Sequence, residues 1–342
     1  MFQPKRLVFC GGGTRCIVFV EALVELEKAG VLRDVSEYWG TSAGAFVAVV
    51  MAIGKSPSKL KPVIETTNFT NFRDMDLSNL LNITNTWGLD SGKSLATEIG
   101  RVLDELVAGS SSYTLSDVPS LSVIVSDLNR RETLVLNGKT HPTLRIVDAV
   151  RASMGLPMFY CPYKDPESGN LWIDGALRAN FAWNLLPSDA DRRASLGFCI
   201  TKPPKQGPES LAEYMFSMVH FDEPAKHVVW KRDWPHNILW FPAPPFPAWY
   251  MKLNAEDFEL LWSSGREVAI SWLSTSVNIM PRPVGETVES PLQSCPLNIP
   301  LPTHRASPTE SSGSLLSHPS FPGGSVVLPP PGGRRTFRRW SL

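Results

Sequence analysis

A serine flanked by glycines is the first candidate for chemistry in this chain of 342 residues. It stands in the motif Gly40-Thr41-Ser42-Ala43-Gly44. A Gly-x-Ser-x-Gly motif is typical of a nucleophile elbow, a sharp strand-to-helix turn that exposes the serine hydroxyl. Its glycines avoid collisions with the neighbouring strand and helix. The alternative is a glycine-rich turn whose serine only caps the next helix. An aromatic pair at 38–39 and an apolar run at 45–50 flank the motif as a strand and a helix would. We therefore interpret Ser42 as a nucleophile.

A second glycine-rich turn follows the apolar run at 7–10. Its residues are Gly11, Gly12, Gly13, Thr14 and Arg15. Glycines at a strand-to-helix turn leave backbone amides free to bind a phosphate or an oxyanion. The dinucleotide fingerprint is broken at Cys16, where its last glycine belongs, and no Gly-Lys-Ser/Thr of a phosphate loop follows. If the strands before the two glycine turns are sheet neighbours, both turns open at the same end. We then expect the turn at 11–15 to form an oxyanion hole for Ser42.

A serine nucleophile needs a base, and Asp174 is the best candidate. An ordinary triad places a histidine on a loop after a late strand, and none of the six histidines stands in a glycine-containing turn after a strand. Asp174 directly follows an apolar run at 171–173 and is itself followed by Gly175 and Ala176. A partly desolvated carboxylate can accept the serine proton directly, although an aspartate there could also only cap the turn. We predict that Ser42 and Asp174 both lie on exposed turns.

Apolar runs and helical periodicities alternate along residues 1–280. Strands are predicted at 7–10, 38–39, 121–125, 133–136, 171–173 and 196–200. Helices are predicted at 15–29, 45–53, 92–107, 144–152, 209–219 and 255–274. Such alternation predicts an α/β protein with a mainly parallel sheet that helices cover on both faces.

The composition excludes several classes of protein. Lys+Arg and Asp+Glu both number 33, so the chain lacks the basic field that nucleic-acid binding requires. The longest nearly unbroken apolar run, 44–54, is far shorter than the ~18 residues of a membrane span. No secretory signal is recognisable, because the run at 7–10 is too short and ends in glycines. Five cysteines without paired spacing exclude a disulfide framework or a zinc knuckle and indicate reduced thiols in an intracellular protein.

The composition changes after residue 280. Twelve of the 30 prolines lie in 281–342, together with repeated serines and glycines and without apolar periodicity. The chain ends in a basic segment that contains Arg334, Arg335, Arg338 and Arg339. We predict a catalytic domain over 1–280 and a disordered tail over 281–342.

Three motifs together carry a family resemblance. The stretches at 11–15, 40–44 and 174–176 resemble, in order and spacing, those of the patatin-like phospholipases. Two further stretches, 89–92 and 152–157, resemble segments that line the active site in that family. The resemblance covers about residues 5–275. It implies a three-layer α/β/α fold and a Ser–Asp dyad, with no metal, no cofactor and no catalytic histidine.

The resemblance also implies the activity and the partner. The chain is expected to be a phospholipase A-like serine esterase that cleaves fatty-acyl esters through an acyl-enzyme intermediate. Its substrate would be a lipid at a membrane or lipid-droplet surface, and the protein would be cytoplasmic with peripheral membrane association. The turn at 11–15 departs from the family pattern because Cys16 replaces a glycine, and Ala176 replaces the last glycine of Asp-Gly-Gly. A catalytically weak or inactive acyl-lipid binding protein is therefore the alternative, with a nucleotide-binding oxidoreductase and a structural scaffold as weaker ones.

The segment 240–251 combines several aromatic residues with prolines. Such a segment could form a rigid loop that dips into a bilayer surface. Alternatively, its aromatic side chains pack over the sheet as part of the core, as large aromatics usually do.

Overall fold

Short apolar runs form the strands of a central sheet in the computed structural model. The structure describes residues 2–54, 56–74, 77–201 and 223–276, and the single positions 207, 214 and 217. The strands are β1 (Arg6–Phe9), β2 (Glu37–Thr41), β3 (Gly88–Asp90), β4 (Leu121–Asp127), β5 (Glu132–Asn137), β6 (Met158–Tyr160), β7 (Tyr163–Lys164), β8 (Leu171–Asp174), β9 (Ser195–Thr201) and β10 (Ile238–Pro242).

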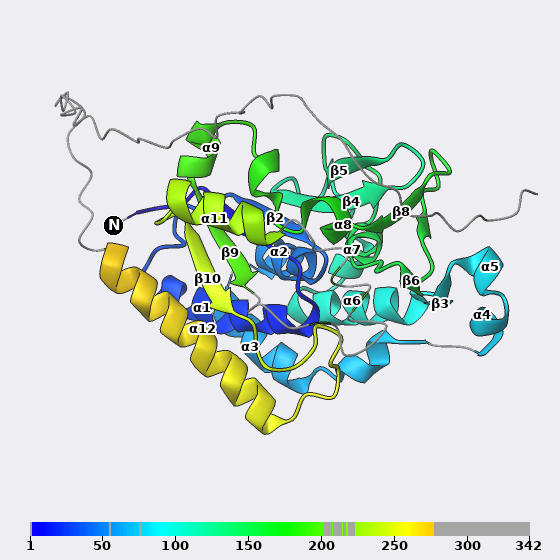
Figure 1. The fold of residues 1–342 in the computed structure, drawn as a ribbon, viewed down its shortest axis with the longest axis horizontal. Coiled ribbons are helices and arrows are strands. Elements are labelled where there is room, and N and C mark those ends of the chain that lie inside the picture. Colours follow the sequence, from blue (N-terminus) through cyan, green and yellow to red (C-terminus); the bar gives the residue numbers. More distant parts are fainter. Residues whose placement is uncertain are drawn as a thin grey trace, which may run out of the picture. The chain divides into compact units, whose positions relative to one another are not determined.

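Helices connect these strands (Figure 1). The α-helices are α1 (Val18–Lys28), α2 (Ala43–Gly54), α3 (Pro57–Thr66), α4 (Leu77–Leu81), α5 (Ile83–Thr86), α6 (Lys93–Leu106), α7 (Ile146–Ser153), α8 (Ala176–Ala179), α9 (Asp189–Arg193), α11 (Glu223–Asp233) and α12 (Ala255–Ser276). The 3-10 helices are η1 (Gly13–Ile17), η2 (Phe69–Phe72), η3 (Ser110–Ser112) and η4 (Ala182–Leu185).

The main sheet has the order β10-β9-β1-β2-β4-β8-β7, and β5 also pairs with β4. Its pairs from β10 to β4 are parallel, whereas β5, β8 and β7 join in antiparallel fashion. The strands β1 and β2 are direct neighbours, with Phe9 opposite Gly40. The predicted adjacency of the two glycine-rich turns is therefore confirmed, because both turns follow these paired strand ends.

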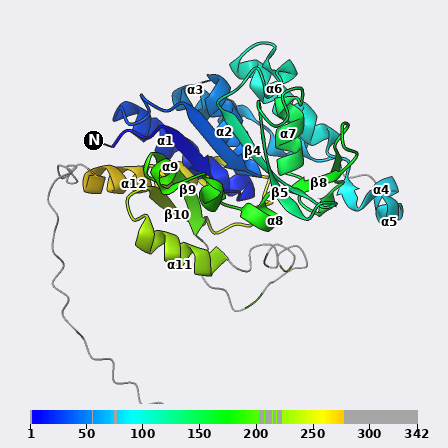
Figure 2. The same ribbon diagram turned by 90° about the horizontal axis from the view of Figure 1, so that it is seen from above.

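Helices cover both faces of the sheet (Figure 2). The chain moves from β1 through β2 to β4 in one direction along the sheet, so right-handed crossovers place α1 and α2 on the same face. It moves the opposite way from β9 to β10, which places α11 on the other face. The last helix, α12, packs on α1. This is the predicted α/β architecture with a mainly parallel sheet.

Most of the predicted elements are confirmed. The helix predicted from residue 15 begins as the 3-10 helix η1 and becomes α-helical only at Val18. Several elements were not predicted, among them α3, α11 and the edge strand β10 at 238–242. The helix predicted over 209–219 and the tail predicted over 281–342 fall in parts of the chain that the structure does not describe, apart from single positions. Within the described residues, no helix is both long and apolar enough to cross a bilayer.

Candidate active site

Ser42 occupies a strained turn between β2 and α2. Its φ is +54°, in the left-handed region that residues other than glycine rarely adopt. A Cβ at Gly40 would lie 2.4 Å from the Gly44 carbonyl oxygen, and one at Gly44 would lie 2.3 Å from the Cys10 carbonyl oxygen. Both glycines are thus required by close backbone contacts, as a nucleophile elbow demands. This turn places the Ser42 side chain at the carboxyl end of the sheet.

Asp174 is the last residue of β8 and faces Ser42. The Ser42 Oγ donates a hydrogen bond of 2.8 Å to Asp174 Oδ2. The other carboxylate oxygen, Oδ1, accepts a hydrogen bond of 2.8 Å from the Ala176 amide. A Cβ at Gly175 would lie 2.3 Å from the Ile124 carbonyl oxygen, so only glycine allows β8 to approach β4 at this point. The turn at 174–176 therefore aims the carboxylate at the serine.

The environment of Asp174 differs from the predicted exposed turn. Asp174 is buried, with 3% of the residue surface exposed. Burial raises the pKa of Asp174 to about 7, and hydrogen bonds from the Ala176 amide and the Ser42 hydroxyl oppose that shift. A carboxylate with such a pKa can accept a proton near neutral pH.

Ser153 adds a contact that the motifs did not predict. Its hydroxyl, fully buried at the end of α7, accepts a 2.8 Å hydrogen bond from the Ser42 amide and donates a 2.6 Å hydrogen bond to the Ile124 carbonyl. The sequence resemblance had singled out 152–157 as lining the site, but it gave no role to this hydroxyl. The contact connects the strained turn to β4.

The turn at 11–15 leaves two of its amides available. The Gly11 amide donates to the Asn180 carbonyl at 3.1 Å, and the Thr14 amide donates to the Ala248 carbonyl at 2.9 Å. The amides of Gly12 and Gly13 have no acceptor among the described residues. A Cβ at Gly11 would lie 2.9 Å from Ser42 Cβ, so this turn lies directly beside the serine. Of the five residues predicted for the oxyanion hole, Gly12 and Gly13 thus offer free backbone donors.

Arg15 and Cys16 have other roles in the structure. The Arg15 Nε donates a 2.7 Å hydrogen bond to the Phe246 carbonyl. Cys16 is buried, and its Sγ lies 3.5 Å from the Cys10 carbonyl oxygen. The Cys16 side chain, which replaces a glycine of the family pattern, thus packs from η1 against the residue that follows β1.

The aromatic segment 240–251 packs onto the turn at 11–15. Phe241, Phe246 and Ala248 are buried, and the Ala248 and Phe246 carbonyls accept the hydrogen bonds just described. The Arg73 side chain donates a 2.8 Å hydrogen bond to the Trp249 carbonyl. These contacts agree with the interpretation of the segment as part of the core.

An apolar cavity of about 80 Å³ begins next to the serine. Gly13, Ala43, Met154 and Ala248 line it near Ser42, and the side chains of α1, α2, α3 and η2 line its depth. These deeper residues include Ile17, Val20, Phe46, Val47, Val50, Leu60, Ile64, Phe69 and Phe72. Its walls offer little besides hydrocarbon, which suits a fatty-acyl chain.

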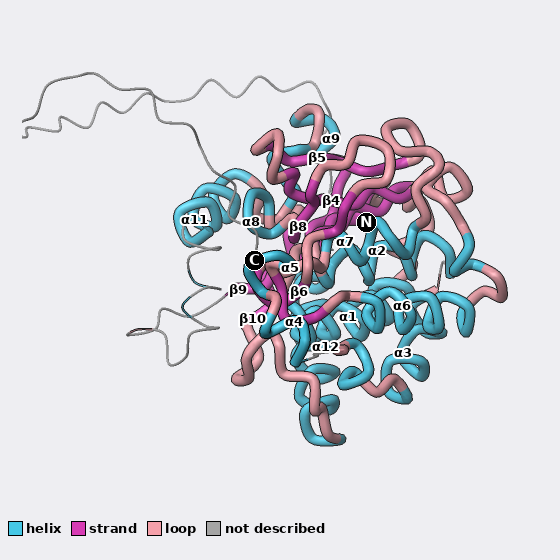
Figure 3. The backbone as a smooth tube through the Cα atoms, turned by 90° about the vertical axis from the view of Figure 1, so that its right-hand side faces the viewer, coloured by secondary structure: helices cyan, strands magenta, loops and turns pink. Residues whose placement is uncertain are grey.

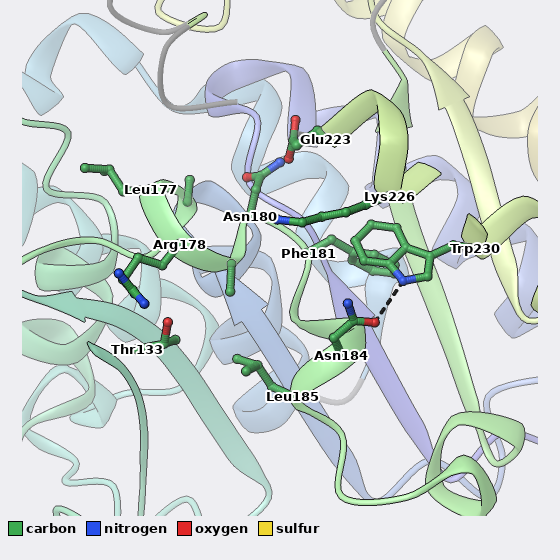
Figure 4. Close-up of a pocket in the computed structure, with 12 residues that line it drawn as sticks. Thr133, Leu177, Arg178, Asn180, Phe181, Asn184, Leu185, Glu223, Lys226 and Trp230 are labelled. Atoms are coloured by element: carbon green, nitrogen blue, oxygen red, sulfur yellow. Dashed lines mark hydrogen bonds between the residues drawn. The ribbon is translucent and has the colours of Figure 1, made fainter. Parts of the chain in front are cut away.

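A second pocket lies between α8, η4 and α11 (Figure 4). It is lined by residues of α8 and α11, including Arg178, Asn180, Glu223 and Lys226. Asn180 is buried, and its Oδ1 has no hydrogen-bond partner in the part of the chain that the structure describes. A Cβ at Gly11 would lie 2.5 Å from that atom. Figure 4 shows Asn180, Glu223 and Lys226 on one side of the pocket and Arg178 on the other. The apolar cavity thus borders Gly13 and Ala43, the neighbour of Ser42, and Asn180 of the second pocket lies beside Gly11.

The described histidines have partners elsewhere. His141 lies edge-on to Trp172, and His227 Nε2 lies 3.5 Å from Cys199 Sγ. His236 accepts a hydrogen bond from Trp272 at its backbone carbonyl. None of these three is a hydrogen-bond partner of Ser42 or Asp174. His220, His304 and His318 belong to the residues that the structure does not describe.

Comparison with known proteins agrees with this geometry. The sequence profile of the patatin-like phospholipases matches residues 7–186, more than half of the chain. The chain belongs to the patatin-like phospholipase family. Membership supports lipid acyl hydrolysis at the level of the family and agrees with the resemblance seen in the three motifs.

Two curated relatives and one solved structure extend the comparison. An uncharacterised protein of Acanthamoeba polyphaga mimivirus, R571, is 26% identical over 57% of this chain and 66% of its own length, just under two thirds. An uncharacterised protein of Bacillus subtilis, YqhO, is 27% identical over 69% of this chain and 86% of its own length. The crystal structure of VipD from Legionella pneumophila has a TM-score of 0.53 at 14% identity, covering 80% of this chain and 67% of that chain. At this identity the likeness concerns the fold alone.

Proposed function

We propose that this protein is a lipid acyl hydrolase, a serine carboxylic-ester hydrolase in which Ser42 is the nucleophile and Asp174 the base. The 2.8 Å hydrogen bond from Ser42 Oγ to Asp174 Oδ2 carries the proposal. It joins a serine on a strained turn to a buried carboxylate whose pKa is raised to about 7, and these are the groups that acyl transfer through a serine requires.

In the first step, Ser42 Oγ attacks the ester carbonyl carbon while its proton passes to Asp174 Oδ2. The carbonyl oxygen becomes an oxyanion, and the free amides of Gly12 and Gly13 are the donors suited to stabilise it. The intermediate then expels the alcohol, which takes the proton from Asp174, and an acyl group remains bonded to Ser42. A water molecule attacks this acyl-enzyme while Asp174 accepts its proton. The collapse releases the fatty acid and returns a proton to Ser42.

The two pockets support a substrate with an apolar acyl part and a polar alcohol part. The acyl chain would enter the cavity between α1, α2 and α3, where burial of each methylene contributes ~0.8 kcal/mol. The alcohol part would lie toward Asn180 and Lys226, in the pocket of Figure 4. A phospholipid or a related acyl ester at a lipid surface has this division.

Labelling with a fluorophosphonate separates this proposal from an inactive acyl-lipid binding protein. Such a reagent bonds covalently only to an activated serine. We expect labelling of the wild type and of Ser122→Ala, since Ser122 is a buried serine of β4 outside the site, and none of Ser42→Ala. Hydrolysis of a p-nitrophenyl ester should follow the same order. The folded wild type could also neither react with the reagent nor hydrolyse any ester of a lipid panel. This result would contradict the proposed activity and favour an inactive acyl-lipid binding protein.

A further inference from the structure

Four large apolar side chains are exposed on one protrusion of the fold. Leu80 and Leu81 of α4 are 51% and 79% exposed, Trp87 after α5 is 53% exposed, and Met158 of β6 is 51% exposed. Trp87 precedes β3, and β3 pairs with β6 so that Gly88 lies opposite Met158. Figure 1 shows α4 and α5 at the right-hand edge, and Figure 3, which looks onto that edge, shows them in front. We name these four residues the α4–β6 surface.

Three of the four residues of the α4–β6 surface lie in a stretch without charge. No Asp, Glu, Lys, Arg or His occurs between Leu77 and Leu89, where the polar residues are Ser, Asn and Thr. A single exposed leucine is ordinary, but several large apolar side chains on one protrusion indicate an interaction site. The lack of charge indicates that the partner surface is apolar or has no net charge.

The backbone of this surface is strained. Trp87 and Met158 have φ values of +53° and +64°, in the left-handed region where bulky residues are genuine outliers. Only four residues other than glycine adopt positive φ in the described part of the chain, and one of the other two is Ser42. Elsewhere this fold uses glycine for such a conformation, for example at Gly92. Strained residues concentrate at functional sites. A turn alone would be formed more easily by glycine, so the large side chains of Trp87 and Met158 indicate a function for this surface.

Hydrogen bonds connect the α4–β6 surface to the wall of the apolar cavity. The Tyr160 hydroxyl, in the strand of Met158, donates a 3.4 Å hydrogen bond to the carbonyl of Phe72, which lines the cavity. The Asp74 amide, two residues after Phe72, donates a 2.7 Å hydrogen bond to Asp90 Oδ2 at the end of β3. A partner that covers Leu81 and Trp87 would therefore lie against the segment that continues into the cavity wall.

We propose that the α4–β6 surface docks on a lipid surface, with Leu80, Leu81, Trp87 and Met158 inserted among the headgroups. The choice of a lipid as the partner rests on the proposed function, because a hydrolase of lipid esters must reach its substrate in a bilayer or droplet. Tryptophan is favoured at the membrane–water interface, and an uncharged apolar protrusion gains affinity by burying area rather than by attracting anionic headgroups.

The test is binding of the full chain to phosphatidylcholine vesicles, measured by sedimentation at low and high salt. The variant Leu81→Ser/Trp87→Asn should bind roughly tenfold more weakly or worse, since two large apolar side chains no longer leave water. Asparagine tolerates the left-handed backbone of Trp87. The matched control is Val228→Ser/Ile270→Ser, which removes side chains that are 70% and 51% exposed on α11 and α12, and it should bind like the wild type. Wild-type binding should be insensitive to salt.

Hydrolysis of a soluble short-chain ester separates this proposal from the proposed function. The Leu81→Ser/Trp87→Asn variant should retain the wild-type rate on that ester, whereas Ser42→Ala should bind vesicles normally without turnover. Unchanged vesicle binding of the α4–β6 variant would overturn the proposal, as would absence of wild-type binding or equal loss in the control. If the wild type is a dimer, the α4–β6 variant is a monomer and both bind vesicles equally, the surface is an interface with a second copy of the chain instead. Inactivity of the wild type on every ester would contradict the hydrolase while leaving the vesicle result to decide the docking surface.

Discussion

The hydroxyl of Ser153 lies 2.8 Å from the backbone nitrogen of Ser42 and connects the strained turn to β4 through Ile124. The same strand also holds Asp174, the proposed base, because Ser126 Oγ donates a 3.0 Å hydrogen bond to the Asp174 carbonyl. One central strand thus fixes the positions of both Ser42 and Asp174. Ser153 is a positioning residue, since it acts on the substrate only through Ser42.

Removal of this hydroxyl should reduce turnover more than binding. In Ser153→Ala the Ser42 amide and the Ile124 carbonyl both lose their partner, and the strained turn can relax. A misplacement of about 1 Å can cost on the order of 100-fold in rate. We therefore expect kcat on a soluble ester to fall roughly 10- to 100-fold, with KM changed less than about twofold.

Ser110 provides the control for a purely structural effect. It is also a fully buried serine, and its Oγ donates a 2.8 Å hydrogen bond to the Leu103 carbonyl away from the site. Ser110→Ala should lower stability by a similar amount, about 1–3 kcal/mol, and leave kcat unchanged. Equal losses of kcat in the two variants would show that Ser153 has no positioning role.

The raised pKa of Asp174 predicts the pH dependence of activity. Burial raises this pKa to about 7, and only the ionised carboxylate can accept the serine proton. On soluble esters, kcat/KM should therefore increase about tenfold per pH unit below 7 and level off above it. A profile that is flat between pH 5 and 8 would contradict the role of Asp174 as the base.

The same shift predicts that Asp174 opposes folding at high pH. Its pKa is about 7 in the folded chain and roughly 3.9 in the unfolded chain. The protonated form thus stabilises the fold fully below about pH 4, and this contribution is lost as pH rises from about 4 to 7. The loss is on the order of a few kcal/mol. Asp174→Asn should abolish hydrolysis yet raise the melting temperature at pH 8 more than at pH 5. Equal changes at the two pH values would contradict the raised pKa.

The sequence predicted the parts of the site that local chemistry determines. Gly40, Gly44 and Gly175 make close backbone contacts and lie within a few residues of the side chains that they position. Short motifs in the sequence therefore predict these parts of the site. The burial of Asp174 and the role of Ser153 depend on contacts with β4, and for Ser153 also with the turn at Ser42. These segments lie far away in the sequence, and no local pattern indicates the contacts. The helix α11 was missed because Trp230 is its only buried residue, so it lacks the apolar period of an ordinary amphipathic helix. The 240–251 segment was ambiguous since only the tertiary contacts of Phe246 and Ala248 decide between core and free loop.

The two glycines with free amides should differ in their tolerance of a side chain. A Cβ at Gly13, where φ is +61°, would lie 1.9 Å from the Ala248 carbonyl oxygen, a backbone atom. A Cβ at Gly12 would meet only side-chain ends, the nearest at 2.8 Å, and its φ of 172° suits any residue. Gly13→Ala should thus reorient the turn and lose at least about 100-fold in kcat, as for the removal of an oxyanion donor. Gly12→Ala should retain far more activity, and near-wild-type turnover in folded Gly13→Ala would contradict this role of the turn.

Filling the apolar cavity should change the preferred acyl length. Val50 lines the cavity from α2, so Val50→Phe removes space that the far end of a long chain would occupy. Each methylene that is excluded costs ~0.8 kcal/mol, or about fourfold in kcat/KM. We expect a loss on dodecanoyl and longer esters with butanoyl hydrolysis almost unchanged, and Val50→Ala should keep the long-chain activity. Parallel losses on short and long esters would indicate that the acyl chain lies elsewhere.

The tail over 281–342 should be dispensable for the chemistry. Its twelve prolines and lack of apolar periodicity provide too little burial to offset the entropy of ordering it, and α12 has already ended at Ser276. Truncation after Met280 should leave the melting temperature and the hydrolysis of a soluble ester nearly unchanged.

Binding of the truncated chain to anionic vesicles should weaken, because Arg334, Arg335, Arg338 and Arg339 are lost. The difference from the full chain should disappear as salt screens the attraction. This salt dependence distinguishes the tail from the uncharged α4–β6 surface, whose contribution to phosphatidylcholine binding should persist in the truncated chain. Aggregation of the truncated chain, or loss of its activity on the soluble ester, would mean that residues after 280 belong to the folded domain.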